Sequence, residues 1–534
     1  MNIFLFGIGG TGARVLRSLT YCLASNMGDF APGITFVPMI IDHDNLNKDK
    51  DIAIDTMEEY RTISDAIHGQ MNASSHDNSY RNFFLPRMKY LSEIQQGNAN
   101  IRANFPASFQ FQFGIGNNNS QGTFSNYIDL NALGGDLSIT SDLLKALYND
   151  EQSYFNDAAG NRIDNPVAEL NLDLGKGYRG NPNIGTVVFD SITDTPAYDY
   201  FTKNFLPGQD AIVIIGSIFG GTGSSGIPKL IEAIRTNPAT GWSTAKVAAI
   251  MVMPYFKVDT PQNTPNNVTP AIQDEIFKSK QKAALTFYDS CTINGQSMND
   301  NFDAIYYVAE EDSRQHRNRY SEGGTDQQNL ANIVDLIAAM GVIDFVDKIQ
   351  RGTRLNKFNE YGLEADSTDN QKLILTNFIN ADLNGPLKRL TALALALKHY
   401  RDHIYAGKPN NKASYYGDNG LKIPQNINKG IYKNLKTFSD YFATWLDEME
   451  KVNHSFAPYD FAPSTPLNKV VEGFVSKEGN WVHHKGVSYS DFDSLASTVW
   501  VNKASKLQNK DEAFMKVLFD AATKEADFAT QKRK

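Results

Sequence analysis

The sequence predicts an α/β protein with a Rossmann-like parallel sheet, a long central helix and a second, largely helical C-terminal domain. In the first half, short apolar runs rich in β-branched residues alternate with helical segments. Two of these runs end in glycine-rich turns that lead into helices. After about residue 326 the apolar pattern becomes helical. We therefore divide the chain into residues 1–325, a central helix over 326–350 and a C-terminal domain over 351–534.

The strands of the sheet are expected where apolar runs are short and bounded by turn residues. The clearest is DAIVIIGS, residues 210–217, which is apolar without alternation, as in strands buried on both faces. The full set of expected strands covers residues 2–6, 35–41, 185–189, 210–217, 246–254 and 304–309.

Helices are expected where apolar residues recur with a helical period. One follows the first glycine turn and another follows a loop rich in Pro and Asn at 260–269. The expected helices cover residues 12–24, 272–288, 327–348, 386–403, 431–452 and 511–525.

Composition excludes several classes of protein. The 534 residues are 41% apolar and 21% charged, as in ordinary globular proteins. A net charge of −9 disfavours a dedicated nucleic-acid binder, and no clear nucleic-acid surface is visible. An adaptor protein is a possible partner, but the sequence does not identify one. No apolar run is long enough to span a membrane. Cys22 and Cys291 are too few for a disulfide framework, so we expect a soluble, cytoplasmic protein.

The first glycine loop, Gly7–Gly12 (GIGGTG), matches GxGxxG between an expected strand and helix. Its residues would offer backbone N–H groups to a phosphate at a helix N-terminus. Asp42 ends the next strand, where Rossmann enzymes place a ribose-binding acid. Ala13 and Arg14 follow the loop, which excludes a Walker A motif. The alternative is a tight turn without a ligand. The candidate phosphate-binding residues here are Gly7, Gly9, Gly10, Thr11 and Gly12.

The second glycine loop, Phe219–Gly226 (FGGTGSSG), follows the clearest strand and also leads into a helix, with Pro228 in its first turns. Two such loops at the carboxyl ends of parallel strands favour a nucleoside di- or triphosphate held from two sides. A dinucleotide enzyme needs only the first loop. The candidate residues here are Gly220, Gly221, Thr222, Gly223, Ser224 and Ser225.

The GGTGSSG segment resembles the signature loop of the tubulin/FtsZ superfamily, usually GGTGSG or GGTGTG, with one extra serine. The first glycine loop is similar to that family's first phosphate loop. Residues 41–46, which include Asp42 and Asp44, resemble its second loop. Residues 113–122, with Gly116, are similar to the third loop, which faces the γ-phosphate, and VMPYF at 252–256 to a strand ending in Pro-Phe. The resemblance covers about the first 310 residues.

The resemblance implies a GTPase domain of tubulin/FtsZ type that binds GTP or GDP with Mg²⁺. Magnesium would lie mainly on phosphates and waters, with Asp44 contacting it through water, so no set of protein metal ligands is expected. The family's base pocket includes the start of the central helix, here Asn329 and Asn332. Their amide groups suit a purine edge. The alternative is that both are solvated residues of a first helical turn.

The family also implies a filament-forming, prokaryotic cytoskeletal protein that assembles head to tail with copies of itself, each subunit completing its neighbour's active site. Residues 378–383 (FINADL) resemble the Asn-x-Asp-Phe core of the loop responsible, so Asp382 would position the attacking water. The family's second acid falls at Gly385. The same segment also fits an ordinary turn and helix cap.

Two other functions remain open. Gly385 and the helical C-terminal domain favour a nucleotide-binding regulator that does not polymerise. The first glycine loop with Asp42 fits an NAD-dependent Rossmann oxidoreductase, although the second glycine loop would then have no role.

His399 and His403 lie four residues apart on an expected helix, a spacing that can bind zinc. The segment lacks the glutamate of HExxH, and the sequence indicates no third ligand. We expect two exposed histidines near the end of a helix.

Overall fold

The computed structural model describes residues 1–30, 33–44, 46–69, 79–96, 102–111, 122–128, 148, 154–156, 158–164, 168–178, 180–258, 274–312, 315–318, 329–363, 372–374, 384–410, 413–471 and 488–529. A seven-stranded, all-parallel sheet forms its centre, with the strand order β13-β11-β7-β6-β1-β2-β3. The strands are β1 (Asn2–Ile8), β2 (Thr35–Ile41), β3 (Arg87–Met88), β6 (Ala211–Ser217), β7 (Lys246–Val252), β11 (Ala304–Glu310) and β13 (Phe358–Leu363).

The strand order reverses between β1 and β6. The chain builds outward from β1 to β2 and β3, then returns to the other side of β1 and continues through β6, β7, β11 and β13. In the shared register Gly7 of β1 lies opposite Ile215 of β6. Open α/β sheets bind their ligands outside the carboxyl ends of the strands at such a reversal. Both glycine loops follow the two strands that flank it.

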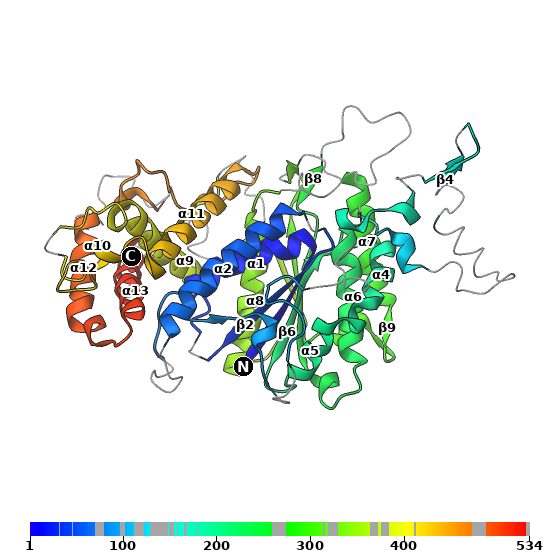
Figure 1. Cartoon of the computed structure of the whole chain (residues 1–534), viewed down its shortest axis with the longest axis horizontal. Helices are drawn as coiled ribbons and strands as arrows, with labels where there is room; N and C mark the ends of the chain where they lie inside the picture. The colour runs from blue at the N-terminus through cyan, green and yellow to red at the C-terminus, as the bar shows by residue number, and fades with distance from the viewer. Residues whose placement is uncertain are drawn as a thin grey trace.

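Helices cover both faces of the sheet (Figure 1). Strand residues alternate between the two layers, so that Ile3 and Leu5 belong to one hydrophobic cluster and Phe4 and Phe6 to the other. One face carries α1 (Gly9–Ala24), α2 (Lys48–His68) and α8 (Ile333–Arg351), and the other carries α4 (Pro182–Phe189), α5 (Pro196–Asn204), α6 (Gly221–Arg235) and α7 (Asp274–Ser290).

The C-terminal helices pack beside α1 and α2 and share one continuous hydrophobic cluster with them (Figure 1). Tyr21 of α1 contacts Phe438, Phe442 and Trp445, with ring centroids 5.4, 5.3 and 4.7 Å away. The C-terminal helices are α9 (Asn384–His399), a π-helix (Tyr400–Ile404), α10 (Ile423–Asn426), α11 (Gly430–Lys451), α12 (Tyr489–Asn502) and α13 (Lys510–Ala529).

The end of α2 is closed by a residue from the far end of the chain. The side-chain amide of Asn509, which precedes α13, donates to the carbonyl oxygens of Ala66 and Ile67, both at 2.8 Å. Beside it, the rings of Phe83 and Phe519 meet edge to face at 4.9 Å. The first and last parts of the chain therefore share one core.

Three further strand pairs are small. They are β4 (Tyr154–Asn156) with β5 (Arg162–Asp164), β8 (Phe256–Val258) with β12 (His316–Asn318), and β9 (Thr292–Ile293) with β10 (Gln296–Ser297). Within the described residues, no helix combines the length and apolar character needed to cross a membrane.

The expected strands at 2–6, 35–41, 210–217, 246–254 and 304–309 are confirmed as β1, β2, β6, β7 and β11. The strand expected at 185–189 is wrong, because these residues lie in α4. Pro182 begins that helix and the Asn181 side chain caps it, signals that outweigh a short β-branched run. The central helix begins at Ile333 rather than at 326. β13, from the range assigned to the C-terminal domain, joins the central sheet.

Candidate functional site

The two glycine loops meet at the reversal of strand order. α1 begins at Gly9, directly after β1, and α6 begins at Gly221, a few residues after β6. Gly9 has φ +67°, a backbone conformation that glycine adopts most easily. A methyl group placed on Gly9 would lie 3.3 Å from Cβ of Thr222. The N-terminal turns of α1 and α6 are therefore direct neighbours.

Both of these helix N-termini lack a side-chain cap. The N-cap residues are Ile8 for α1 and Gly220 for α6, neither makes a side-chain capping bond, and no acid lies in either first turn. The backbone N–H groups of a first turn have no partner within the helix, and they carry the positive end of its dipole. Two adjacent, uncapped N-termini suit an anion. Other helices around the sheet, α2, α4, α5 and α8, are capped by side chains of Asn47, Asn181, Thr195 and Asn332.

Two glycines of the loops, Gly12 and Gly223, serve close packing. A methyl group on Gly12 would lie 2.5 Å from the carbonyl carbon of Gly7, and one on Gly223 would lie 2.3 Å from the backbone oxygen of Ser217. Larger residues at Gly12 or Gly223 would push the helix away from its strand. These positions explain the glycine pattern without a ligand, so they are poor places to test ligand binding by substitution.

The hydroxyl groups of the loops differ in their availability. The Ser225 side chain is buried and donates to the carbonyl oxygen of Gly221 at 2.7 Å, and the Ser224 hydroxyl donates to that of Gly220. Thr11 accepts a hydrogen bond from Arg14 at 3.2 Å. Thr222 is partly exposed and faces the first glycine loop. Among the predicted hydroxyls, Thr222 is the best placed to contact a ligand between the loops.

A buried charge network underlies the first glycine loop. Arg14 of α1 pairs with Asp49 of α2, and its Nη2 donates to the Tyr255 hydroxyl at 2.5 Å. Tyr255 in turn donates to Asp335 of α8 at 3.1 Å. Burial alone would lower the pKa of Arg14, but Tyr255, Asp49 and Asp335 outweigh it and raise the pKa. Burial raises the pKa of Asp335 to about 6. One cation thus links α1, α2 and α8 beneath the candidate phosphate site.

The two predicted base-pocket residues are engaged within the protein. The backbone N and the side-chain amide of Asn329 donate to the two carboxylate oxygens of Asp49, at 2.9 and 3.0 Å. Asn332 is the N-cap of α8: its side-chain oxygen accepts from Val334 N, and Asp335 accepts from Asn332 N. Asn332 is 3% exposed, so it is not a solvated residue of the first turn, and these described contacts are those of a helix cap.

Asp42 and Asp44 lie at the carboxyl end of β2, one side chain away from the first glycine loop. Asn47 donates to Asp42 Oδ2 at 3.0 Å, and a methyl group on Gly10 would lie 3.1 Å from the Asn47 amide nitrogen. The backbone N of Asp44 donates to Asp42 Oδ1 at 3.1 Å. Burial, with Asp44 nearby, raises the pKa of Asp42 to about 7. Cations or hydroxyl donors near this carboxylate would favour its charged form.

His43, between these acids, is also buried. Its Nδ1 lies 2.6 Å from the Tyr178 hydroxyl, and the two rings are 5.2 Å apart. Burial lowers the pKa of His43 to about 3, so the imidazole is neutral near pH 7.

Two predicted site residues, Gly116 and Asp382, lie outside the described residues. Gly385, the position of the family's second acid, is exposed in the first turn of α9, and a methyl group there would lie within 4 Å of no described residue.

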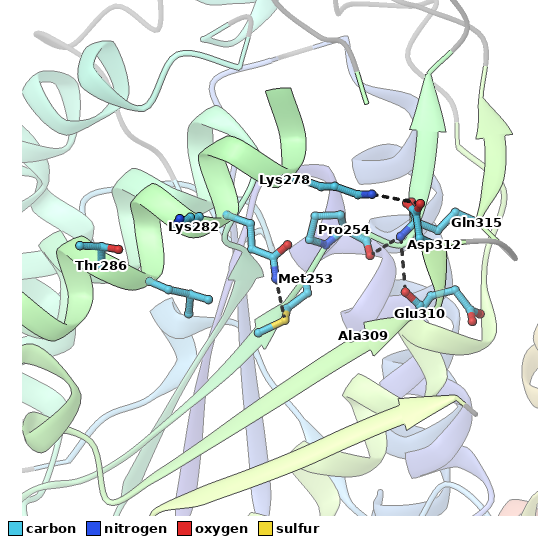
Figure 2. A pocket seen from close by; sticks show the side chains of 11 residues that line it. Met253, Pro254, Lys278, Lys282, Thr286, Ala309, Glu310, Asp312 and Gln315 are labelled. Atoms are coloured by element: carbon cyan, nitrogen blue, oxygen red, sulfur yellow. Dashed lines mark hydrogen bonds and ion pairs between the residues drawn. The ribbon is translucent and has the colours of Figure 1, made fainter. Parts of the chain in front are cut away.

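A separate pocket of about 500 Å³ lies at the carboxyl ends of β7 and β11, beneath α7 (Figure 2). Gln315 donates to the backbone oxygen of Pro254 at 3.0 Å, and Lys278 pairs with Asp312 at 3.0 Å. Its lining includes no residue of either glycine loop. The sequence does not indicate this pocket, because its residues come from α7, from β11 and from the segments that follow β7 and β11.

The partners of Arg14 were also not predicted. One signal was present: Arg14 and Arg17 lie three apart on a helix otherwise rich in apolar residues, which places both on one buried face. Their partners come from distant segments, and nothing in the sequence pairs them.

No protein-family model matches the chain, and a search of curated proteins finds no match.

Proposed function

We propose that this chain is a tubulin/FtsZ-like nucleotide-binding protein that holds the phosphates of GTP or GDP between its two glycine loops. The observation that carries the proposal is the close approach of Gly9 to Thr222, where an added methyl group on Gly9 would lie 3.3 Å from Cβ of Thr222. It joins two uncapped helix N-termini at the reversal of strand order, where α/β sheets bind nucleotides. In this proposal one phosphate chain accepts hydrogen bonds from both N-termini.

The residues of the site fit a nucleotide to different degrees. The backbone amides of Gly9, Gly10, Gly221 and Thr222 suit phosphate oxygens. Asp44 is the acid suited to contact Mg²⁺ through water, and the ion's charge would offset that of the phosphates. A guanine base would bind Asn329 only if the side-chain amide of Asn329 left Asp49 and formed a hydrogen bond with the edge of the base instead. In this proposal Asn332 acts mainly as the cap of α8.

The proposal includes head-to-tail assembly and hydrolysis at the subunit interface. Asp382 of one subunit would position water beside the nucleotide of the next, as the family resemblance implies. With Gly385 in place of a second acid, we propose slow turnover. We also propose a cytoplasmic location, in keeping with the free thiols of Cys22 and Cys291.

The second candidate is a dinucleotide-binding oxidoreductase. Two observations favour it: the strand order is that of dinucleotide-binding folds, and Asp42 ends β2. It leaves the uncapped N-terminus of α6 without a role. The C-terminal helices favour a third form, a regulator that binds nucleotide without polymerising.

Substitutions of Thr222 test the phosphate site without disturbing the fold. Thr222 is the second residue of α6, where an acid stabilises the helix by about 0.3–1 kcal/mol. Thr222→Asp would nevertheless repel a phosphate, whereas Thr222→Asn is a neutral control of the same size. We expect Thr222→Asp to weaken GTP binding by roughly 100-fold or more, with unchanged or higher thermal stability, and Thr222→Asn to bind nearly as wild type.

Binding is measured by calorimetry with GTP, GDP and NAD⁺, and assembly by sedimentation and electron microscopy. Equal GTP affinity in both Thr222 variants would show that the two glycine loops do not hold the phosphates. Tight NAD⁺ binding without GTP binding would replace the proposal with the oxidoreductase. GTP binding without sedimentable polymer would favour the regulator.

A further inference from the structure

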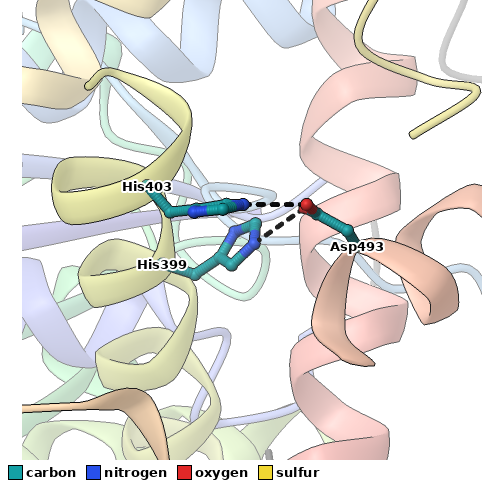
Figure 3. Close-up of side chains that lie close together, drawn as sticks. All are labelled: His399, His403 and Asp493. Carbon is teal, nitrogen blue, oxygen red and sulfur yellow. Dashed lines mark hydrogen bonds and ion pairs between the residues drawn. The ribbon is translucent and has the colours of Figure 1, made fainter. Parts of the chain in front are cut away.

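Three buried side chains converge within the C-terminal helices, away from the sheet (Figure 3). His399 ends α9, His403 lies in the π-helix and Asp493 is in α12. Nε2 of His399 is 3.0 Å from Oδ1 of Asp493, and Nε2 of His403 is 2.8 Å from Oδ2. The expectation of exposed histidines is wrong, because α12 covers this end of α9 and leaves the imidazoles 0% and 11% exposed.

The ligand atoms of the trio already approach the geometry of a metal site. One ligand atom from each residue lies within 4.8 Å of the others. In a tetrahedral site with bonds of about 2.0 Å, neighbouring ligand atoms are about 3.3 Å apart. The nitrogen-to-oxygen distances of 3.0 and 2.8 Å, each to a different oxygen of Asp493, are slightly shorter than this, so the carboxylate and the imidazoles would have to adjust when an ion binds between them.

Aromatic rings of α12 hold both imidazoles in place. His399 stacks on Phe492 with ring centroids 4.1 Å apart, and His403 stacks on Tyr489 at 4.9 Å. Ligand rings fixed in this way lose little conformational freedom when an ion binds. Both stacking partners lie within four residues of Asp493, so one segment of α12 orients all three groups.

The carboxylate of Asp493 has a further hydrogen-bond donor, and the backbone around His403 forms a π-helix. The buried hydroxyl of Tyr415 donates to Oδ1 of Asp493 at 2.6 Å, which fixes the carboxylate as outer hydrogen-bond partners do in metal sites. The helix changes from α to π at Tyr400, and the backbone N of Tyr405 donates to the Tyr400 oxygen at 2.8 Å. Such π-helical turns occur frequently at functional sites.

We propose that His399, His403 and Asp493 bind a divalent transition-metal ion, and that zinc is the ion they fit best. Two imidazoles and one carboxylate form a ligand set that zinc accepts, with a fourth position left for water. His403 is the most exposed of the three, so water reaches the ion from its side. The ion joins α9 to α12 and thereby stabilises the C-terminal helices, a role independent of nucleotide binding.

The test uses the full-length protein after treatment with a chelator and dialysis. Zinc alone is titrated by calorimetry, and bound metal is counted by atomic emission. We expect one zinc ion per chain and a higher melting temperature with zinc. Cobalt added in its place should give the visible absorption of a tetrahedral site. His403→Gln and Asp493→Asn should each weaken zinc binding by roughly 100-fold or more.

Two control variants keep the trio and change other histidines. His316→Gln alters a partly exposed residue of β12, and H483Q/H484Q removes an adjacent pair. Both should bind zinc as wild type does. If Asp493→Asn does not fold, the cobalt spectrum of His403→Gln decides. No saturable uptake by wild type, wild-type affinity in His403→Gln, or loss of zinc in H483Q/H484Q alone would overturn the proposal and leave the trio as a hydrogen-bonded link between helices.

Discussion

Arg17 of α1 and Glu448 of α11 form a buried ion pair, with Nη1 2.6 Å from Oε2 and Nη2 3.2 Å from Oε1. Oε2 also accepts a hydrogen bond from the backbone N of Ala331, just before α8, at 3.0 Å. One carboxylate of a C-terminal helix thus contacts both the helix that follows the first glycine loop and the segment that leads into α8. A shift of α11 would therefore affect the positions of α1 and of the segment that leads into α8, both beside the proposed phosphate site.

The ion pair predicts a large loss of stability on Glu448→Ala. A buried arginine without its partner should lower the free energy of unfolding by about 3–5 kcal/mol, measured by urea denaturation. Asp447→Ala is the matched control, because the neighbouring pair of Asp447 and Lys451 has side chains that are 57% and 60% exposed. We expect it to cost less than about 1 kcal/mol. Similar losses in both variants would contradict the prediction.

Asp42 and His43 predict opposite pH dependences of stability. The pKa of Asp42 rises from 3.8 to about 7 on folding, so the folded state binds the extra proton between these values and stability falls as pH rises. The pKa of His43 falls from 6.5 to about 3, so the unfolded state binds the extra proton and stability rises with pH. The two contributions nearly cancel between about pH 4 and 6.5.

Single substitutions should reveal how Asp42 and His43 each change the dependence of stability on pH. Between pH 4.5 and 6.5, the contribution of this pair to stability should fall by roughly 2–3 kcal/mol in His43→Gln and rise by a similar amount in Asp42→Asn. Urea denaturation at several pH values, with chelator and without nucleotide, measures both. Asp51→Asn, which changes an exposed acid on α2, serves as the control. Identical slopes in the two variants and in wild type would refute the prediction.

Gly385 predicts a gain of hydrolysis. The position is exposed, has room for a side chain and lies in the first turn of α9, where an acid is favourable. If Asp382 acts in a neighbouring active site, Gly385→Asp should raise GTP turnover by about tenfold, and Asp382→Ala should lower it by roughly 100-fold without preventing assembly. Phosphate release is the readout, and Gly385→Asn is the uncharged control. Turnover that is the same in all variants would exclude this loop from catalysis.

Asn332 predicts a loss of stability without a loss of binding. Asn332→Ala removes the cap of α8 and should cost about 1 kcal/mol in urea denaturation, whereas Asn332→Ser keeps a capping oxygen and should restore most of it. GTP affinity should change little in either. A large drop in affinity in both variants would show instead that the amide contacts the base.

Much of the fold could be predicted because its signals are local. The strands at 210–217 and 246–254 are recognisable from uninterrupted apolar runs, and the glycine loops from the turns that follow strands. The run at 185–189 was ambiguous, because five apolar or small residues fit a strand or a buried helix equally well. Pro182 and Asn181, which decide the matter, lie upstream of the run.

The side-chain partners of the site could not be predicted, because they join distant segments. Arg14 and Tyr255 are 241 residues apart, and His399 and Asp493 are 94 apart. The sequence offered the histidine pair but gave no way to choose its third member among many acids. The burial of the two histidines could not be predicted either, since it depends on α12 covering the end of α9.

The contact of Asn509 with the end of α2 bears on how the chain is made. The carbonyl oxygens of Ala66 and Ile67 accept hydrogen bonds from the side-chain amide of Asn509, which is synthesised more than 440 residues later. Phe83 likewise remains without Phe519 until α13 has been synthesised. The end of α2 therefore cannot complete its packing until residues 509–519 have been synthesised and have left the ribosome. A nascent chain that stops before Asn509 would leave the last carbonyl groups of α2 without this partner.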